Sequence, residues 1–323
     1  MYKQIYKQIK KYDNIVIARH IGVDPDAMSS AIALRDSIRL TFPKKNVFAI
    51  GTGTVRFNYL GKLDKDINFD ELDNILLIVV DTPDKKRVDL DGFNKYVKSI
   101  KIDHHPFIEE FCDIEMIDDK KSSASEMIYN LIKNTKLKMN VDIAKTIFCG
   151  IVADTNRFLY NNTSSDTFKV ISELLKDYYF DITECYANLY HKPFAEMQLL
   201  SYMTDNMKIT DNGVGSVKID NDIINKYQLD SISGGDLINE FNHIDELLVW
   251  VTATEDIKNS CIRVSVRSRG PIINKILEKY HGGGHQLASG ARVPSYEEVD
   301  LLVKDLDNLC GKYLKESDSN ENQ

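Results

Sequence analysis

The sequence contains few cysteines, and their spacing does not suit a thiolate metal site. Only five occur in 323 residues, an odd number, and none forms a Cys-x-x-Cys pair. They are Cys112, Cys149, Cys185, Cys261 and Cys310. Scattered cysteines of this kind are typical of reduced, buried thiols in a cytoplasmic protein. We therefore expect reduced thiols and a cytoplasmic location.

Long apolar runs are absent as well. No stretch approaches the roughly 20 residues that a helix needs to cross a bilayer. The first residues, Met1 to Tyr6, lack the apolar core of a signal peptide. The sequence therefore predicts a protein with no membrane partner.

The sequence has fewer basic than acidic residues. Lysine and arginine total 41 against 49 aspartates and glutamates, which gives a net charge of −8. A chain of this charge repels polyanions, so we expect no binding of long duplex nucleic acid, although a local basic patch can hold a short nucleotide. Hydrophobic residues make up 43% and charged residues 28%, as in ordinary globular proteins, and the length suits about two domains.

Acidic and histidine side chains follow the strand-like runs of the first half of the chain. The first such loop leaves an apolar run at residues 15–18 and leads into a helix-like run from Ala27. The side chains are His20, Asp24 and Asp26 in that loop, Asp81 after residues 75–80, Asp103, His104 and His105 after 100–102, and Asp154 after 150–153. Because ligands bind at the carboxyl ends of parallel strands, we expect these loops to converge on one site.

Five of these side chains are carboxylates, and the charges of four of them predict a metal site. Two carboxylates ~4 Å apart repel by roughly 4 kcal/mol at an effective dielectric near 20. Two divalent cations would balance the charges of Asp24, Asp26, Asp81 and Asp154. Oxygen ligands with a minority of imidazoles favour manganese or magnesium over zinc. Paired cations about 3.5–4 Å apart are the usual apparatus for hydrolysing phosphate esters.

Strands alternate with helical stretches over the first part of the chain. This alternation predicts an α/β fold with a doubly wound, mostly parallel sheet in residues 1–190. We expect a helical linker at 191–207, a smaller α/β domain at 208–315 with its last helix at about 296–309, and a disordered tail at 316–323.

A second group of polar residues lies in the smaller domain. Residues 261–269 alternate strictly between apolar and polar side chains, which predicts a strand with three arginines on its polar face. A later run of three glycines and a histidine exposes backbone N–H groups that suit a phosphate or a base. These residues are Arg263, Arg267, Arg269, Gly282, Gly283, Gly284 and His285. We interpret them as a pocket for one end of a nucleotide; a solvated, charged strand face is the competing interpretation of the arginines alone.

These motifs resemble those of the DHH phosphoesterase superfamily. The triplet that names it is here Asp103-His104-His105, and residues 265–269 and 282–290 resemble the motifs of its DHH-associated domain. Length and the lack of appended domains are most similar to the bacterial nanoRNase and pAp phosphatase type. The resemblance implies hydrolysis of short single-stranded RNA and dinucleotides to mononucleotides, and removal of the 3′-phosphate from adenosine 3′,5′-bisphosphate (pAp).

The resemblance also implies a role for each loop residue. A first cation would be held by His20, Asp24 and Asp81, and a second by Asp26, Asp81, His104 and Asp154, with Asp81 bridging. His105 would face the scissile phosphate, so His105 and Asp81 are the expected catalytic residues. The two ions are expected to be Mn²⁺, with Mg²⁺ as the alternative. The second domain would hold the far end of the substrate with its arginines, the glycine run and His285.

Three departures from the family pattern are local. Val23 and Pro25 replace a common proline and glycine in the first motif, and Asn156 stands where a glycine often follows. Asparagine tolerates a positive φ, so the last change is mild. Pro25 restricts the loop between two expected ligands.

Several alternatives stay open at this stage. An enzyme of cyclic-di-AMP turnover that hydrolyses pApA would use the same site, and a nucleotide-sensing protein without turnover would keep part of it. Manganese-dependent inorganic pyrophosphatases share the first domain, but the lysine- and arginine-rich motif of their second domain is not found here. The direction of cleavage and the oligomeric state also stay open, with a homodimer as one alternative.

Overall fold

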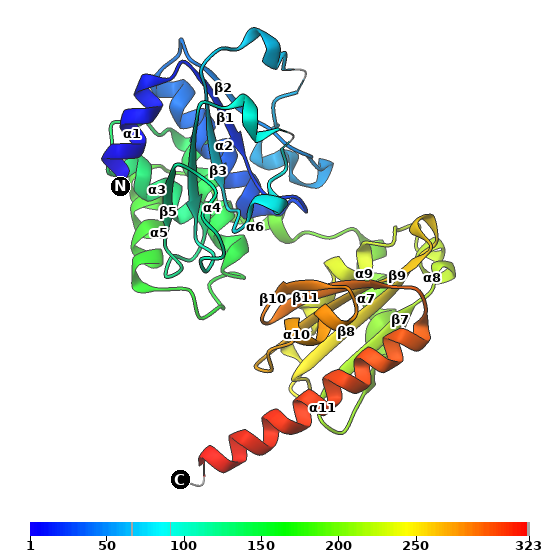
Figure 1. Cartoon of the computed structure of the whole chain (residues 1–323). Coiled ribbons are helices and arrows are strands. Elements are labelled where there is room, and N and C mark those ends of the chain that lie inside the picture. The colour runs from blue at the N-terminus through cyan, green and yellow to red at the C-terminus, as the bar shows by residue number, and fades with distance from the viewer. Residues whose placement is uncertain (66, 91, 322–323) are drawn as a thin grey trace. The chain divides into compact units, whose positions relative to one another are not determined.

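The chain divides into two compact units. The computed structural model describes residues 1–65, 67–90 and 92–321, and the units are Met1–His191 and Lys192–Gln323. The boundary lies one residue from the predicted end of the first domain. Each unit has its own sheet and is described by itself (Figure 1).

The first unit is built on a five-stranded sheet in the order β2-β1-β3-β4-β5. Every neighbouring pair is parallel. The strands are β1 (Asn14–Ala18), β2 (Asn46–Ala49), β3 (Ile75–Val80), β4 (Lys98–Asp103) and β5 (Ile114–Ile117). All six residues of β3 are buried, as expected of a central parallel strand covered on both faces. The predicted α/β fold with a parallel sheet is confirmed.

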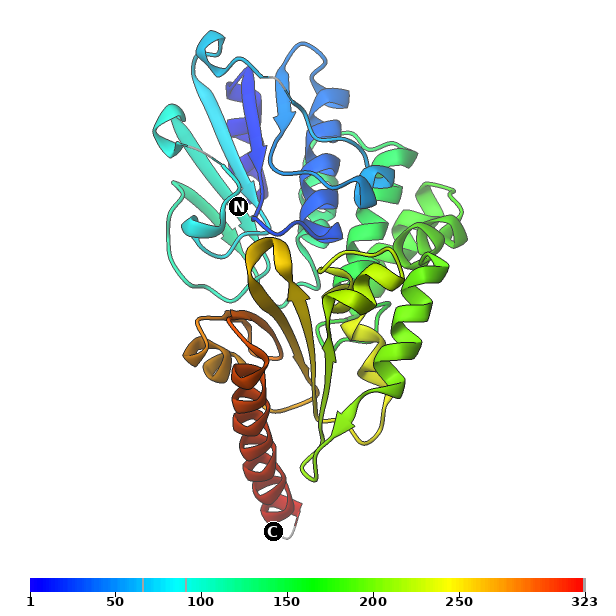
Figure 2. The same cartoon turned by 90° about the vertical axis from the view of Figure 1, so that its right-hand side faces the viewer.

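The two faces of this sheet are covered differently. The α-helices pack into the larger apolar cluster on one face, where α2, α3 and α4 lie together (Figure 2). They are α1 (Tyr2–Lys11), α2 (Pro25–Thr41), α3 (Ala124–Lys133), α4 (Val141–Asp154), α5 (Ser165–Asp177) and α6 (Ile182–Tyr190). The other face packs against residues in and around three short 3-10 helices, η2 (Phe69–Glu71), η3 (Lys85–Arg87) and η4 (Phe93–Lys95). The strand order is that of a doubly wound sheet. The α-helices nevertheless cover one face, and the 3-10 helices and their neighbours cover the other.

The strand order places a ligand site between β1 and β3. From β1 the chain passes to β2 on one side and then to β3 on the other, so the connections after β1 and β3 diverge. In sheets of this order, ligands bind in the crevice at that reversal, outside the carboxyl ends of the strands. The loops that begin at His20 and Asp81 leave these two strand ends.

Two predicted details of the first unit were wrong. Strand β5, at Ile114–Ile117, was not among the strand-like runs singled out in the sequence. Residues 150–153 are not a strand but the last turn of α4, and Asp154 is its final residue. Gly150 explains the close packing there, because a Cβ at this position would lie 2.8 Å from the Cβ of Ser29 on α2.

The second unit contains a six-stranded mixed sheet in the order β10-β11-β9-β8-β7-β6. Only β7 and β8 pair in parallel among the described residues. The strands are β6 (Lys208–Ile209), β7 (Val214–Ile219), β8 (Val249–Asp256), β9 (Cys261–Ser268), β10 (Gly283–His285) and β11 (Ala288–Val293). The helices are α7 (Phe194–Asp205), α8 (Asn221–Lys226), α9 (Ser233–Asp236), α10 (Asn274–Lys279) and α11 (Tyr296–Glu321), with 3-10 helices η5 (Ile238–His243) and η6 (Ile257–Asn259).

Three predictions for this unit need correction. The expected linker helix is α7, whose Leu199 and Met203 are fully buried in the core of the second unit, so it belongs to that unit. The hairpin of β10 and β11 was not predicted, because two of the three residues of β10 are glycines. Helix α11 continues to Glu321 where a disordered tail was expected, and residues 322 and 323 lie outside the described residues. No helix in the described part of the chain has the length and apolar character to span a bilayer.

Candidate metal centre

The predicted ligands come from four segments that meet at the carboxyl edge of the first sheet. His20 and Asp24 follow β1, Asp26 lies in the first turn of α2, and Asp81 follows β3. His104 follows β4, and Asp154 ends α4. Their donor atoms fall into groups in which all atoms lie within 4.8 Å of one another. The structure thus brings together all six predicted ligands.

The first group consists of His20, Asp24 and Asp81. The Nε2 atom of His20 lies 3.3 Å from Oδ2 of Asp24 and 3.3 Å from Oδ2 of Asp81. The Nδ1 atom of His20 lies 2.7 Å from the carbonyl oxygen of Ile21. That hydrogen bond places a proton on Nδ1, so Nε2, which faces the two carboxylates, is the nitrogen that would bind a cation once it has lost its own proton.

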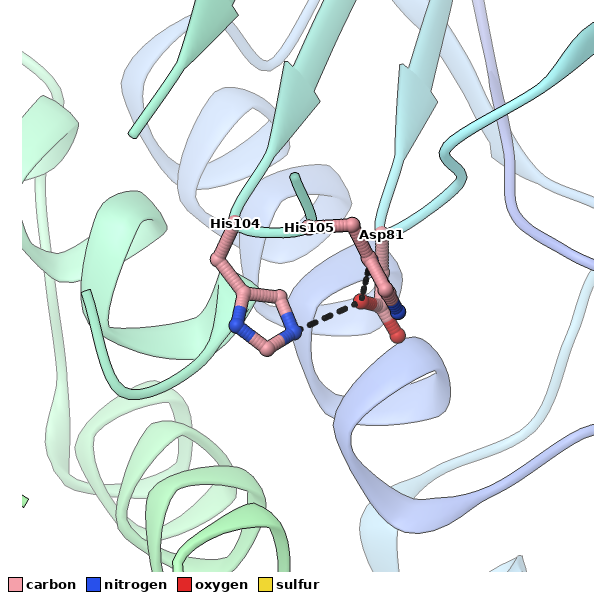
Figure 3. Close-up of side chains that lie close together, drawn as sticks. All are labelled: Asp81, His104 and His105. Carbon is pink, nitrogen blue, oxygen red and sulfur yellow. Dashed lines mark ion pairs between the residues drawn. The ribbon is translucent and has the colours of Figure 1, made fainter. Parts of the chain in front are cut away.

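The second group consists of Asp26, His104 and Asp154. The Nε2 atom of His104 lies 3.3 Å from Oδ2 of Asp154 and 3.3 Å from Oδ1 of Asp81. Asp81 therefore turns Oδ2 toward the first group and Oδ1 toward the second. Figure 3 shows the contact of Asp81 with His104. One carboxylate with an oxygen in each group is the arrangement that a bridging ligand requires.

Asp26 also holds the beginning of helix α3. Its Oδ2 accepts a hydrogen bond from the backbone N–H of Ala124 at 2.8 Å, and its Oδ1 accepts one from Ser125 at 3.0 Å. These N–H groups have no partner within the helix, and the positive end of the helix dipole favours a carboxylate there. The carboxylate is thus fixed against the beginning of α3.

Pro25 has a different role from the one expected. Asp24 is the N-cap of α2, and its side chain accepts a hydrogen bond from the N–H of Ala27. Pro25 is the first helical residue, where the fixed φ of proline suits a helix start and its missing N–H costs nothing. The proline therefore fixes the spacing of Asp24 and Asp26 rather than straining a loop.

The backbone around two ligands takes left-handed conformations. Asp81 has φ of 50°, a value that aspartate tolerates better than most residues. After Asp154, three consecutive residues have positive φ: Asn156 at 46°, Arg157 at 65° and Phe158 at 68°. The expectation for Asn156 is confirmed. Strained turns of this kind persist where the surrounding structure determines the position of a functional side chain.

The charges of the cluster show how strongly its members interact. Burial, together with the charge of Asp81, raises the pKa of Asp26 to about 7. Burial also raises the pKa of Asp154 well above its usual range. Burial favours the neutral form of His20, yet its hydrogen bonds to Asp24 and Asp81 raise its pKa to about 11. In the absence of cations, the carboxylates are thus balanced by protons.

The donor set fits divalent cations. The Oδ1 atom of Asp81 is buried and accepts no hydrogen bond from the residues that the structure describes, although His104 and His105 lie within ion-pair distance of it. A cation at this place would supply the interaction that a buried carboxylate oxygen needs. Four carboxylates and two imidazoles make up the two groups, and no thiolate belongs to them. Such a set favours Mn²⁺ or Mg²⁺.

His105 is held differently from the six ligands. Its Nδ1 donates a hydrogen bond to Oδ1 of Asp103 at 2.8 Å, and its backbone N–H donates to the same oxygen at 3.3 Å. Nδ1 also lies 3.6 Å from Oδ1 of Asp81 (Figure 3). His105 also forms a group with Asp81 and His104 whose donor atoms lie within 4.8 Å of one another. Because its Nδ1 is engaged by Asp103, we interpret His105 as a residue oriented at the edge of the cluster.

Sequence reasoning missed the buried residues that support the cluster. Asp103 was noted only as part of the triplet, and Lys101 and Arg19 were not singled out. The fully buried Arg19 donates to the carbonyl oxygen of His20 at 2.7 Å and lies 3.4 Å from Oδ2 of Asp89. Charged residues at apolar positions next to expected ligands were the signal that could have found Arg19 and Lys101.

The predicted strand of the second unit is confirmed as β9. Ile262, Val264 and Val266 are buried, while the residues between them are partly exposed. The arginines already have partners within the unit. Arg263 lies 3.5 Å from Oδ2 of Asp256, Arg267 donates to Oδ1 of Asn239 at 3.1 Å, and Arg269 donates to the carbonyl oxygens of Asn242 and Ile244. Part of their role is therefore to hold the end of β8, the 3-10 helix η5 and the residue that follows η5.

The three glycines of the run differ from one another. A Cβ on Gly282 would lie 2.7 Å from the Cβ of Ala291, and one on Gly284 would lie 2.8 Å from the Cα of Ser289. A Cβ on Gly283 would meet nothing within 4 Å. Two of the glycines thus allow the close pairing of β10 with β11, and Gly283 alone leaves open space beside the backbone. His285 is exposed and ends β10.

Two family domains match the chain in the order of its two units. Residues 14–151 match the DHH family, N-terminal domain, and residues 222–312 match the DHHA1 domain. These segments contain all the predicted site residues except Asp154.

Curated relatives match over nearly their whole length. A protein of Bacillus subtilis named bifunctional oligoribonuclease and PAP phosphatase NrnA is 36% identical over 97% of this chain and 100% of its own. A probable enzyme of the same name from Streptococcus mutans is 35% identical over 95% of this chain and 98% of its own. The crystal structure of an exopolyphosphatase-related protein from Bacteroides fragilis superposes with a TM-score of 0.85 at 23% identity, covering 96% of this chain and 97% of that one, which shows the fold.

Proposed function

This chain belongs to the DHH family of phosphoesterases, and we propose that it hydrolyses short oligoribonucleotides to mononucleotides and removes the 3′-phosphate from pAp. The observation that carries the proposal is the position of Asp81, which turns one oxygen to each of two ligand groups. The names of the relatives supply the substrate class.

DHH phosphoesterases depend on metal, and we propose two divalent cations here, Mn²⁺ in preference to Mg²⁺. His20, Asp24 and Asp81 would hold one, and Asp26, Asp81, His104 and Asp154 the other. When bound, the cations would activate water and neutralise the phosphate. Asp26 keeps this edge of the site rigid through α3, while the β-bridge between His20 and Val88 fixes the loop after β1.

The remaining residues would act on the substrate. His105, oriented by Asp103, is placed to donate a hydrogen bond to the scissile phosphate, where charge develops in the transition state. The proposed contacts to the other end of the nucleotide are Arg263, Arg267, Arg269, Gly282, Gly283, Gly284 and His285. A net charge of −8 opposes binding of long polyanions and is compatible with substrates that carry few phosphates.

An assay of the purified chain tests this proposal. With Mn²⁺ added, we expect phosphate release from pAp and complete conversion of pApA and of a labelled five-nucleotide RNA to mononucleotides. Turnover of pApA alone would replace the proposal with a role restricted to dinucleotides. Binding of all three without turnover would indicate a nucleotide sensor. The five cysteines are free, so the assay can include a reducing agent that reproduces the proposed cytoplasmic conditions.

A pair of neighbouring glycine variants tests the substrate contact in the second unit. Gly283→Ala adds a methyl group into open space, so we expect normal folding and a rise in KM for pAp of about fivefold, the value of one lost hydrogen bond. Gly282→Ala is the contrasting variant, because its methyl group would meet Ala291, and it should lower the melting temperature. Unchanged kinetics in a folded Gly283→Ala protein would remove this backbone from the proposed site.

A further inference from the structure

Lys101 is a fully buried lysine at the centre of the first unit. It lies on β4, two residues before Asp103, and its side chain has no exposed surface. Its Nζ donates a hydrogen bond to the carbonyl oxygen of Pro83 at 2.9 Å, lies 3.5 Å from Oδ2 of Asp103 and is 4.8 Å from the centre of the Phe111 ring. An ammonium group in such a place needs compensation, and these three groups provide it.

The partner of Lys101 is buried just as completely. Asp103 has no exposed surface, and its Oδ2 has no hydrogen bond within the described part of the chain, so the ammonium group 3.5 Å away is its source of compensation. The other oxygen, Oδ1, accepts both the N–H and the Nδ1–H of His105. Lys101 thus lies against one oxygen of the Asp103 carboxylate, while the other oxygen orients His105.

Lys101 also contacts the loop that follows β3, through its hydrogen bond to the carbonyl oxygen of Pro83. Pro83 lies two residues after Asp81, in the loop that leaves β3. By donating to its carbonyl oxygen, Lys101 ties that loop to β4, which carries the Asp103 side of the triplet. A single side chain therefore connects the segment of the bridging carboxylate with the segment of His105.

We propose that Lys101 is a positioning residue for phosphate-ester hydrolysis. It compensates the buried charge of Asp103, so that Asp103 holds Nδ1–H of His105 and directs Nε2 toward the scissile phosphate. This inference rests on the proposed function. Partners of this kind around catalytic or metal-bound histidines change activity by roughly 10- to 100-fold when they are removed.

The test must separate positioning from stability. Lys101→Met leaves Asp103 as a buried carboxylate without its cation, so we expect a lower melting temperature. The double variant Lys101→Met with Asp103→Asn leaves no unpaired buried charge, but its neutral asparagine oxygen holds the Nδ1–H of His105 more weakly than the compensated carboxylate does. Lys45→Met is the matched control, because Lys45 is also mostly buried and donates to the carbonyl oxygens of Lys10 and Tyr12, but it precedes β2 at the opposite edge of the sheet.

We expect the double variant to fold, to bind Mn²⁺ within twofold of the original protein and to keep its KM for pAp within about threefold. Its kcat should fall about 10- to 100-fold, and the Nδ1–H resonance of His105 in the NMR spectrum should shift. The control should change none of these. A folded double variant with unchanged kcat and an unchanged His105 resonance would overturn the positioning role. Failure of the proposed function is distinguishable, because the original protein would then hydrolyse neither pAp nor short RNA.

Discussion

Asp81→Asn lowers the rate of pAp and RNA hydrolysis by at least about three orders of magnitude in our account. Asp81 is the one residue that supplies an oxygen to both ligand groups, so its loss affects both cations. Asparagine is the informative replacement because it tolerates the φ of 50° at this position and preserves the shape of the side chain. Steady-state kinetics with added Mn²⁺ measure the effect.

The fold of this variant is expected to persist. Replacing Asp81 relieves repulsion among the carboxylates but also removes the partner of His20 and His104, so the metal-free variant should stay folded and melt somewhat lower than the original protein. Asp119→Asn, at an exposed position outside the cluster, is the control and should leave kinetics and melting unchanged. Turnover near the original rate in Asp81→Asn with excess Mn²⁺ would refute the bridging role.

Removal of metal should have an equally large effect. A chelator is expected to abolish hydrolysis of both substrates, and Mn²⁺ should restore it more fully than Mg²⁺. The cations bind the folded cluster but not the unfolded chain, so at 100 times its dissociation constant each cation should stabilise the fold by about 2.7 kcal/mol. Calorimetric melting with and without Mn²⁺ measures this difference. Activity that survives exhaustive chelation would contradict the account.

Metal uptake should also release protons. The pKa of His20 is raised to about 11 and that of Asp26 to about 7 in the absence of cations. Both groups must lose their protons to act as ligands, so Mn²⁺ affinity should fall as the pH falls through 7. Titration calorimetry in buffers of different ionisation enthalpy counts the protons. Uptake without proton release would show that the cations bind elsewhere.

The site was easier to predict than the segments that carry it. Strands β1, β3 and β4 were found because each contains apolar residues and is followed by a predicted ligand, and parallel strands bring such ends together. Asp154 was predicted correctly as part of the ligand cluster, but it was expected after a strand and lies at the end of helix α4. The run before it is apolar in either case, because residues 150–152 are buried on the inner side of α4 against α2 and α3. A short apolar run does not distinguish a buried helix end from a strand.

The buried polar residues that support the site could not be predicted from the sequence pattern. Lys101 interrupts an apolar run and looks like a solvent-facing residue until Asp103, Pro83 and Phe111 are seen around it. The glycine run was recognised as a unit, but its members differ in a way that only the register of β10 against β11 reveals. Sequence patterns identify which residues can react, whereas contacts between distant segments decide which residues hold them in place.

Electron paramagnetic resonance of the Mn²⁺-loaded protein, combined with a metal count, tests the central claim most directly. We predict two Mn²⁺ ions per chain with the spectrum of a magnetically coupled pair, and loss of that coupling in Asp81→Asn. One ion per chain, or an uncoupled spectrum from fully active protein, would contradict a centre in which a single carboxylate joins two cations.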